Sequence, residues 1–349
     1  MTSSLDVIFP SPGVVELVET DVPAPGPGEI TCAALASLVS TGTETFCLAG
    51  RFDAGTFWEE WVQFPFAPGY SMTARVVAVG EGVTDLSVGD RVALPTSHAQ
   101  FVTVDRAHAV AVPDGVSDED ACWASLAVTT QLGVRRSQLE LGETVGVVGL
   151  GLLGQLVIRY LRLAGARHII AIDPEPKRLE LAREGGATAT IAALADQATD
   201  AILAATGGRL LDVVFDITGH PAAFAAASTL LRPMGRMILL GDSPQPSQQR
   251  LGPRIVADAI SIIGVHAGTA AQHQTPLDRW TGAEMTALFF DYLQDGRMSV
   301  DSLVSHRVSP HDAPQLYAAL TADRSPYMGV LFDWSMLDAG AVVTRAANS

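Results

Sequence analysis

The sequence predicts an α/β protein with two parts, a turn-rich antiparallel β domain and a doubly wound parallel sheet. At 349 residues the chain is about twice the usual size of one domain. The first 115 or so residues are short alternating segments separated by Pro and Gly, which is typical of antiparallel strands. From about residue 118, short apolar runs alternate with helical stretches, as in a parallel sheet with right-handed crossovers.

Composition excludes several classes of partner. The net charge of -16 repels phosphate backbones and anionic membrane surfaces, so we expect no nucleic-acid or membrane partner. The start of the chain has no basic region followed by an apolar stretch, and no window holds the ~18 apolar residues of a spanning helix. The three widely spaced cysteines fit buried thiols rather than disulfides. We therefore expect a cytoplasmic protein that acts on a small molecule.

The elements follow one another in a regular order. Antiparallel strands occupy segments such as 14–30 and 72–95, and a helical pattern over 118–139 leads to the apolar strand 145–148. Later strands are expected at 168–173, 211–219, 235–242 and 260–268. Helices are expected at 155–166, 176–187, 221–234 and 276–295. Residues 304–334 then return as strand, helix and strand to the first domain, and a polar tail follows Trp334.

A glycine-rich turn is the strongest local motif. Gly149-Leu-Gly151-Leu152-Leu153-Gly154 lies between an apolar strand and a helix. The first Gly permits a tight turn, the second allows backbone to approach a pyrophosphate, and the third lets helix and strand pack closely. The helix N-terminus adds unpaired N–H groups and partial positive charge. This context predicts a Rossmann dinucleotide site.

An acidic residue at the end of the next strand indicates which dinucleotide binds. Asp173 comes 19 residues after Gly154, where a carboxylate can accept hydrogen bonds from the adenosine ribose diol and would repel a 2′-phosphate. NAD is therefore expected. Lys177 and Arg178 could instead pair with a phosphate, which keeps NADP open as the less favoured alternative.

Residues 76–93 (VVAVGEGVTDLSVGDRVA), the preceding β domain, and GLGLLG with Asp173 resemble the medium-chain dehydrogenase/reductase superfamily, which includes the zinc alcohol dehydrogenases. The resemblance extends from about residue 10 to 334. It implies a GroES-like catalytic domain from residues 1–125 and 270–349, a Rossmann domain at 126–269, and an active site in the cleft between them. It also implies a homodimer joined near 260–268.

The residues that bind zinc in those relatives are missing. The sequence reads Thr41-Gly42-Thr43-Glu44 and Gly69-Tyr70-Ser71 at the first two positions and Leu126 or Ala124 at the third, and the four-cysteine lobe is absent. We therefore expect no zinc and no other metal. STGTE (40–44) with PGY (68–70) is similar to the bacteriochlorophyllide a dehydrogenase branch, which implies alcohol and ketone chemistry on a bulky substrate, as in secondary metabolism.

Without zinc, a protein group must stabilise charge on the substrate oxygen. Tyr70 occupies a former ligand position and carries a phenol that can donate or accept a proton, although it could instead be a packed aromatic. By resemblance, Thr43 aligns with the hydroxyl that relays a proton, and Glu44 with an acid that orients a metal ligand. Glu44 could polarise Tyr70, bind substrate, or make only a structural hydrogen bond.

Other groups are expected near the nicotinamide. The strand ends Thr218-Gly219 and Leu240-Gly241 should reach the ribose and ring, because ligands in open α/β sheets bind at the carboxyl ends of strands. By resemblance, His266 falls near the carboxamide and is a secondary acid/base candidate or a structural residue.

The segment FDAGTFWEEWVQFPFAPGY (52–70) is rich in aromatics: Phe57, Trp58, Trp61, Phe64 and Phe66. It could wall a pocket for a large substrate or simply pack in the core. The leading prediction is a zinc-independent NAD(H)-dependent oxidoreductase that interconverts a secondary alcohol and a ketone. A quinone or enoyl reductase, or a non-catalytic dinucleotide-binding protein, is the alternative.

Overall fold

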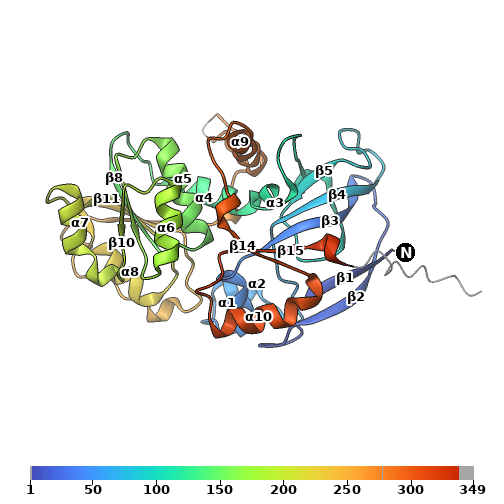
Figure 1. Ribbon diagram of the computed structural model, residues 1–349, viewed down its shortest axis with the longest axis horizontal. Coiled ribbons are helices and arrows are strands. Elements are labelled where there is room, and N and C mark those ends of the chain that lie inside the picture. Colours follow the sequence, from blue (N-terminus) through green and yellow to red (C-terminus); the bar gives the residue numbers. More distant parts are fainter. Residues whose placement is uncertain (1, 277, 338–349) are drawn as a thin grey trace, which may run out of the picture. The chain divides into compact units, whose positions relative to one another are not determined.

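The chain packs into two units in the computed structural model, which describes residues 2–276 and 278–337 (Figure 1). Unit 1 contains the described residues of Met1–Gly50, Glu60–Ser125 and Thr286–Ser349, and unit 2 contains Arg51–Glu59 and Leu126–Met285. The boundary drawn from the sequence at residue 269 therefore falls inside unit 2. The short excursion Arg51–Glu59 also belongs to unit 2, although its sequence neighbours on both sides belong to unit 1.

Strands from both ends of the chain pair in unit 1. One sheet has the order β14-β15-β3-β4-β5-β7, with β6 also paired to β3, and a separate ribbon joins β1 to β2. The pairs are antiparallel except β14 with β15. The strand bounds are β1 Thr2–Ile8, β2 Glu16–Val22, β3 Glu29–Val39, β4 Met72–Val79, β5 Arg91–Leu94, β6 Phe101–Asp105, β7 Val110–Ala111, β14 Val304–Val308 and β15 Gly329–Asp333. The expected return of the C-terminal segment to the β domain is thus observed.

Helices α1 (Thr43–Ala49), α3 (Asp118–Ala121) and α10 (Ala313–Ala322) lie among the strands of unit 1. Helices α3 and α10 fall where the sequence predicted helical segments, whereas α1 falls where it suggested strands alone. Helix α1 begins shortly after β3, and the Glu44 side chain accepts a hydrogen bond from the Ser40 backbone N–H at 2.7 Å, which ties the first turn of the helix to the end of the strand. Helices α2 (Phe57–Trp61), α4 (Ala124–Arg136) and α9 (Gly282–Gln294) contain residues of both units.

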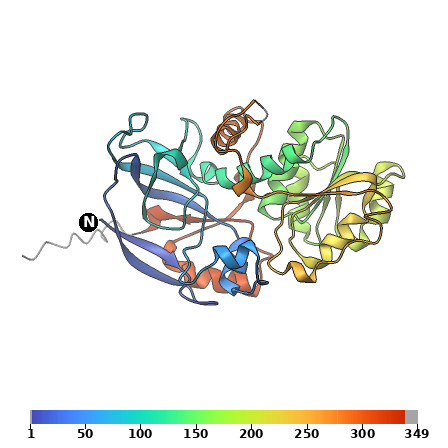
Figure 2. The ribbon, with the colours of Figure 1, turned by 180° about the vertical axis from the view of Figure 1, so that it is seen from behind.

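Unit 2 is a parallel sheet of order β10-β9-β8-β11-β12-β13 (Figures 1 and 2). This order reverses direction between β8 and β11, as in a Rossmann fold, and the crevice at that point is where dinucleotides bind. The strands are β8 Thr144–Val148, β9 His168–Ile172, β10 Ala189–Ile191, β11 Leu211–Asp216, β12 Leu231–Leu239 and β13 Ser261–Gly264, and the helices between them are α5 Leu152–Ala164, α6 Pro176–Gly185, α7 Thr199–Thr206 and α8 Pro221–Ser228.

Two apolar clusters cover the two faces of this sheet. Side chains of α5 and α6 pack with Val145 and Val147 of β8 on one face, whereas side chains of α7 and α8 pack with Val148 and neighbouring strands on the other. Because both faces are buried, the strands are continuous apolar runs rather than alternating ones.

Several element boundaries differ from the expected ones, most clearly those of two helices. The helix expected at 276–295 begins only at Gly282, and residue 277 lies outside the described residues. Thr281 and Glu284 form a capping box, because the Glu284 N–H donates to Thr281 Oγ1 and the Glu284 carboxylate accepts from the Thr281 N–H. The helix expected at 221–234 ends at Ser228, and β12 starts at Leu231 with a register shift against β11.

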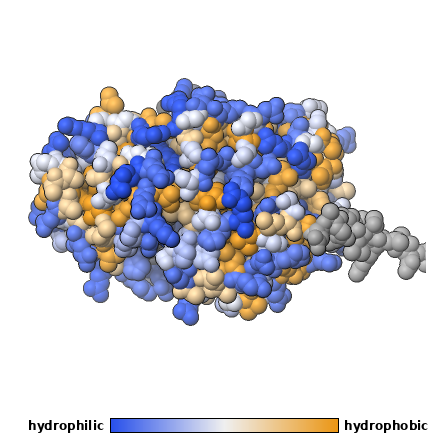
Figure 3. All heavy atoms as spheres, in the orientation of Figure 1, coloured by the Kyte–Doolittle hydropathy of each residue, from blue (hydrophilic) through white to orange (hydrophobic). Residues whose placement is uncertain are grey.

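None of the helices in the described part of the chain has the length and apolar character needed to cross a bilayer. On the face drawn in Figure 3, hydrophilic residues are spread among smaller apolar areas. The tail expected after Trp334 continues as a short 3-10 turn, Trp334–Met336, and positions 338–349 lie outside the described residues.

Candidate active site

The glycine-rich turn joins β8 to α5, and each glycine has a distinct reason to be there. Gly149 has φ +90°, a conformation that favours glycine, and a Cβ on Gly154 would lie 2.1 Å from the Gly149 carbonyl oxygen. A Cβ on Gly151 would meet nothing within 4 Å, so this position faces open space that a pyrophosphate could enter. No described side chain caps α5, which leaves the N–H groups of its first turn, Leu152, Leu153 and Gly154, available to an anion.

Asp173 lies directly after β9 and contacts the glycine-rich turn. Its two carboxylate oxygens accept hydrogen bonds from the N–H groups of Leu150 and Glu175, both at 2.8 Å. Each oxygen keeps a further acceptor position for a ribose hydroxyl. Arg178 lies 3.7 Å from the same carboxylate, and among the described residues its buried Nε has no hydrogen-bond partner. Lys177 is exposed on the first turn of α6.

Gln155 was not singled out from the sequence, yet it ties the turn to α6. Its side-chain amide donates to the carbonyls of Leu150, at 3.2 Å, and Arg178, at 2.8 Å. A glutamine inside an apolar helix pattern carries no sequence signal for this role, because the second carbonyl comes from another helix.

The ends of β11 and β12 approach each other closely. A Cβ on Gly241 would lie 2.4 Å from the Gly219 nitrogen, so only glycine fits there. The Thr218 N–H and hydroxyl both donate to the buried Asp216 carboxylate, whose pKa is raised by burial and lowered by these hydrogen bonds. The Leu240 side chain packs in the core, which leaves only its backbone for a ligand.

His266 follows β13 and is exposed. Its Nδ1 accepts a hydrogen bond from the Gly268 N–H at 3.1 Å, so Nε2 is the ring nitrogen that remains for contact with a ligand. The ring also meets the exposed Phe57 ring edge-on at 4.8 Å between centroids. Within the aromatic segment 52–70, Trp58 and Phe66 are buried, which agrees with the expectation that such side chains pack in the core.

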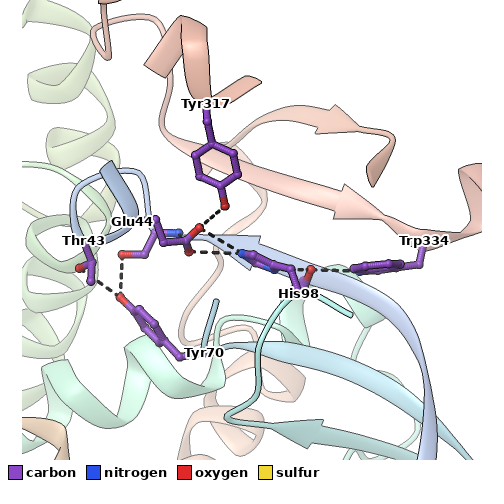
Figure 4. Close-up of polar contacts among 8 residues, drawn as sticks. Thr43, Glu44, Tyr70, His98, Tyr317 and Trp334 are labelled. Atoms are coloured by element: carbon purple, nitrogen blue, oxygen red, sulfur yellow. Dashed lines mark hydrogen bonds and ion pairs between the residues drawn. The ribbon is translucent and has the colours of Figure 1, made fainter. Parts of the chain in front are cut away.

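Three hydroxyl groups converge in unit 1 (Figure 4). The Tyr70 phenol donates to Ser40 Oγ at 2.6 Å and lies 3.5 Å from Thr43 Oγ1. Burial raises the pKa of Tyr70 to about 12, and the negative charge of Glu44 acts in the same direction, whereas the Ser40 and Thr43 hydrogen bonds lower it. Tyr70 is therefore protonated at neutral pH. The sequence identified Tyr70 and Thr43 but not Ser40.

Glu44 is turned away from this hydroxyl cluster. Its buried carboxylate accepts hydrogen bonds from the Ser40 N–H, from His98 Nε2 and from the Tyr317 hydroxyl (Figure 4). Among the described residues it makes no hydrogen bond to Tyr70, so the direct contact considered from the sequence is not observed. Three donors already bond to the carboxylate. Of the three roles considered for Glu44 from the sequence, a structural hydrogen-bonding role fits these surroundings.

His98 continues this network toward the C-terminal strand. Its Nδ1 lies 2.8 Å from Ser37 Oγ, and the Trp334 indole donates to the same oxygen at 3.0 Å. A carboxylate only accepts hydrogen bonds and an indole only donates them. Every group in this network therefore has a partner when His98 donates from Nε2 to Glu44 and accepts at Nδ1 from the Ser37 hydroxyl. The sequence left His98 as a structural histidine, without indicating this network.

Gly69 holds Tyr70 in position. Its φ is +98°, and a Cβ there would lie 2.8 Å from the His98 ring and from the His98 nitrogen. The His98 N–H donates to the Pro68 carbonyl at 2.8 Å. The segment that carries Tyr70 is thus pressed against the buried network.

The residues present do not suit a zinc ion. In the described part of the chain, no three His, Cys, Asp or Glu residues lie together as a metal site would need. Glu44 and His98 are adjacent, but their polar atoms already bond to one another and to protein donors. Burial raises the pKa of the thiols of Cys32, Cys47 and Cys122, which disfavours the thiolate that zinc requires.

Comparison with known proteins gives consistent matches. The family model for alcohol dehydrogenase GroES-like domains matches residues 38–136, and the model for zinc-binding dehydrogenases matches residues 153–281. The L-threonine 3-dehydrogenase of Pyrococcus horikoshii is 25% identical, over 85% of this chain and 89% of that protein.

Solved structures match the fold over nearly the whole chain. The 2R,3R-butanediol dehydrogenase of Bacillus subtilis has a TM-score of 0.77 at 21% identity, covering 95% of this chain and 99% of that one. A structure from Sinorhizobium meliloti 1021, described as a zinc-binding dehydrogenase bound to NADP, has a TM-score of 0.78 at 21% identity, covering 95% and 100%.

Proposed function

Because the chain belongs to the zinc-type alcohol dehydrogenase-like group of the medium-chain dehydrogenase/reductase superfamily, whose members are oxidoreductases, we propose that it interconverts a secondary alcohol and a ketone with NAD(H) and without zinc. The observation that carries the proposal is the Ser40–Thr43–Tyr70 hydroxyl cluster. By the resemblance, Tyr70 occupies a position at which the zinc-dependent relatives have a metal ligand. The threonine, sorbitol and butanediol dehydrogenases among the relatives are named for alcohol substrates, which supports this reaction type.

Unit 2 would hold the dinucleotide. The Gly149–Gly154 turn and the first turn of α5 would bind the pyrophosphate, and Asp173 would accept hydrogen bonds from the ribose diol. Asp173 favours NAD, since its charge would repel a 2′-phosphate. When bound, NAD(H) accepts or supplies the hydride at the nicotinamide ring.

Unit 1 would manage the proton and the substrate oxygen. Tyr70 turns its O–H from Ser40 toward the carbonyl oxygen, and the Ser40 and Thr43 hydroxyls then donate to the phenol oxygen. These two donors stabilise the negative charge that grows on Tyr70 as its proton moves to the substrate. In the oxidative direction Tyr70 would first release its own proton to solvent, and the phenolate, stabilised by the Ser40 and Thr43 hydroxyls, would then accept the proton of the alcohol.

Two further features belong to the proposal. The exposed Phe57 ring beside His266 supports a bulky substrate, because large apolar groups need aromatic contact surface. Strand β13 is the last strand of its sheet and carries the exposed Ile262, which supports a homodimer formed through this edge.

A substrate screen with matched variants tests the proposal. Purified protein is incubated with NAD⁺ or NADP⁺ and small or polycyclic secondary alcohols, including butane-2,3-diol, sorbitol and L-threonine, while NADH absorbance is followed. We expect turnover with NAD⁺ and a loss of about 10²–10⁴-fold in kcat for Tyr70→Phe. Turnover that is unchanged in this variant would remove Tyr70 from the reaction, and a preference for NADP⁺ would overturn the choice of cofactor.

A further inference from the structure

A cavity of about 480 Å³ lies in unit 2, where the end of α4 faces the loop that precedes α9. Leu132, Arg135 and Arg136 line it from the helix, and Asp278 and Trp280 line it from the loop. Cavities of roughly 300–1,000 Å³ are typical sites for small molecules. None of these five residues is among those that would hold the dinucleotide, so the proposed function does not account for the cavity.

The Trp280 ring forms one wall, and its neighbours hold it in place. The Trp280 N–H donates to Asp278 Oδ1 at 3.3 Å. The Thr275 N–H donates to the Asp278 carbonyl at 2.8 Å, and the Asp278 N–H donates to Thr275 Oγ1 at 2.9 Å. The capping box of Thr281 and Glu284 then starts α9 directly after the ring. The indole is therefore positioned before any ligand arrives, which lowers the entropic cost of binding.

Arg135 stacks on this wall. Its guanidinium carbon lies 3.6 Å from the centre of the Trp280 ring, so the guanidinium lies flat on the indole. The N–H groups of a guanidinium point outward in its own plane, which is the plane in which it binds a carboxylate through two parallel hydrogen bonds. Stacking on Trp280 therefore fixes the plane in which Arg135 would bind an anion.

Arg136 brings a second positive charge to the cavity. It is exposed, and among the described residues its side chain has no hydrogen-bond or ion-pair partner. Other arginines of unit 2 pair with acids, as Arg232 does with Asp212 and Arg236 with Glu143. The negative end of the α4 dipole accounts for basic residues in the last turn of the helix, but not for the cavity that these residues line.

We propose that this cavity binds a small organic carboxylate that has an apolar or aromatic body. Arg135 and Arg136 bind the carboxylate group, while Leu132 and the Trp280 ring contact the body. Asp278 reduces the charge of the lining to a net +1. This charge matches a monocarboxylate, whereas the second negative charge of a phosphate group would be repelled by Asp278.

Binding is measured on the full-length protein with three carboxylates: benzoate, cyclohexanecarboxylate and indole-3-acetate. Benzamide, which lacks the charge, acetate, which lacks the body, and inorganic phosphate are the comparison compounds. Calorimetry gives Kd, and the Nε1–H signal of Trp280 in ¹⁵N-labelled protein, assigned by its absence in Trp280→Phe, locates the site.

We expect at least one of the three carboxylates to bind and to shift the Trp280 signal at concentrations at which the comparison compounds leave it in place. The affinity should fall as NaCl is added, because salt screens the attraction between the arginines and the carboxylate. No shift of the Trp280 signal with any of the three carboxylates would overturn the proposal. Equal shifts with benzamide, acetate or phosphate would also overturn it.

Two charge changes of opposite sign test the arrangement. Arg136→Gln should weaken binding of the carboxylate by about threefold to tenfold, since the lost ion pair is an exposed one. Asp278→Asn removes a negative charge but keeps an oxygen that can accept from the Trp280 N–H, so it should strengthen binding by about twofold to fivefold. A variant that merely disturbed the loop or the helix would weaken binding in both cases.

Arg254→Gln is the matched control, because Arg254 is an exposed arginine of unit 2 that pairs with Asp258 and does not line the cavity. It should bind the carboxylate with the native Kd. A native Kd for Arg136→Gln, or a Kd for Asp278→Asn that is not lower than the native one, would overturn the assignment of the cavity to an organic carboxylate.

Discussion

Replacing Glu44 with glutamine should destabilise unit 1 strongly, although the two side chains have nearly the same shape. The carboxylate accepts from the Ser40 N–H at 2.7 Å, from His98 Nε2 at 3.2 Å and from the Tyr317 hydroxyl. The side chain is 1% exposed, so water cannot replace a lost acceptor. Glutamine offers one acceptor oxygen and two donor hydrogens in place of two acceptor oxygens.

The cost follows from these hydrogen bonds. If the amide oxygen keeps Ser40, it can also keep His98 Nε2, which lies 3.3 Å from the same oxygen, but the amide nitrogen then faces the Tyr317 hydroxyl, whose hydrogen must turn away. Turning His98 to its other tautomer would not help, because it would then donate to Ser37, which already accepts from Trp334 and would lack an acceptor for its own hydrogen. One buried donor without a partner costs about 1–3 kcal/mol, and losing the charge on the remaining hydrogen bonds adds roughly 1 kcal/mol. We expect Glu44→Gln to cost about 2–4 kcal/mol.

Calorimetry checks this figure. For a unit of roughly 180 residues, each kcal/mol lowers Tm by about 2–4 °C, so a fall of roughly 4 to 16 °C in the transition of unit 1 is expected. Glu119→Gln is the matched control, because Glu119 pairs with Arg307 at an exposed site where an ion pair contributes about 0–1 kcal/mol. The reasoning is refuted if Glu44→Gln melts within a degree or two of Glu119→Gln.

Two other results should follow from the same structure. Burial raises the pKa of Tyr70 from 10 to about 12, so the folded protein keeps its full free energy of unfolding below pH 10 and should lose about 2.7 kcal/mol of it as pH rises from 10 to 12. Urea unfolding midpoints measured over this range should show the loss, and Tyr70→Phe should lose less free energy of unfolding than the native protein. Gly151→Ala should keep its Tm, because the added Cβ meets nothing within 4 Å, yet bind NADH far more weakly by fluorescence titration; unchanged NADH binding would show that the pyrophosphate does not approach this glycine.

The parallel sheet of unit 2 could be predicted well because its signals are local. The glycine-rich turn and Asp173 lie on a single strand-turn-helix unit and the strand after it, and the parallel sheet followed from the apolar runs. Thr281 and Glu284 have the spacing of a capping box, which marks the start of α9. The sequence prediction started the helix at residue 276 because the apolar pattern extends further toward the N-terminus.

The hydroxyl cluster and the buried network were only partly predictable because their contacts are distant in sequence. Tyr70 and Ser40 are 30 positions apart, and Glu44 and Tyr317 are 273 apart. Ser40 begins the STGTE motif, but that motif assigned it no role, and His98 lies in no motif that links it to its partners. Tertiary contacts such as the pairing of β15 with β3 and the packing of Gly69 on His98 bring these residues together.

The most direct test of metal-free alcohol and ketone chemistry is the turnover number of enzyme dialysed exhaustively against a chelator, with its zinc content measured in the same sample. We expect full turnover at a zinc content far below stoichiometry. Turnover that disappears on dialysis and returns when stoichiometric Zn²⁺ is added would contradict the assignment of the substrate oxygen to Tyr70, Ser40 and Thr43.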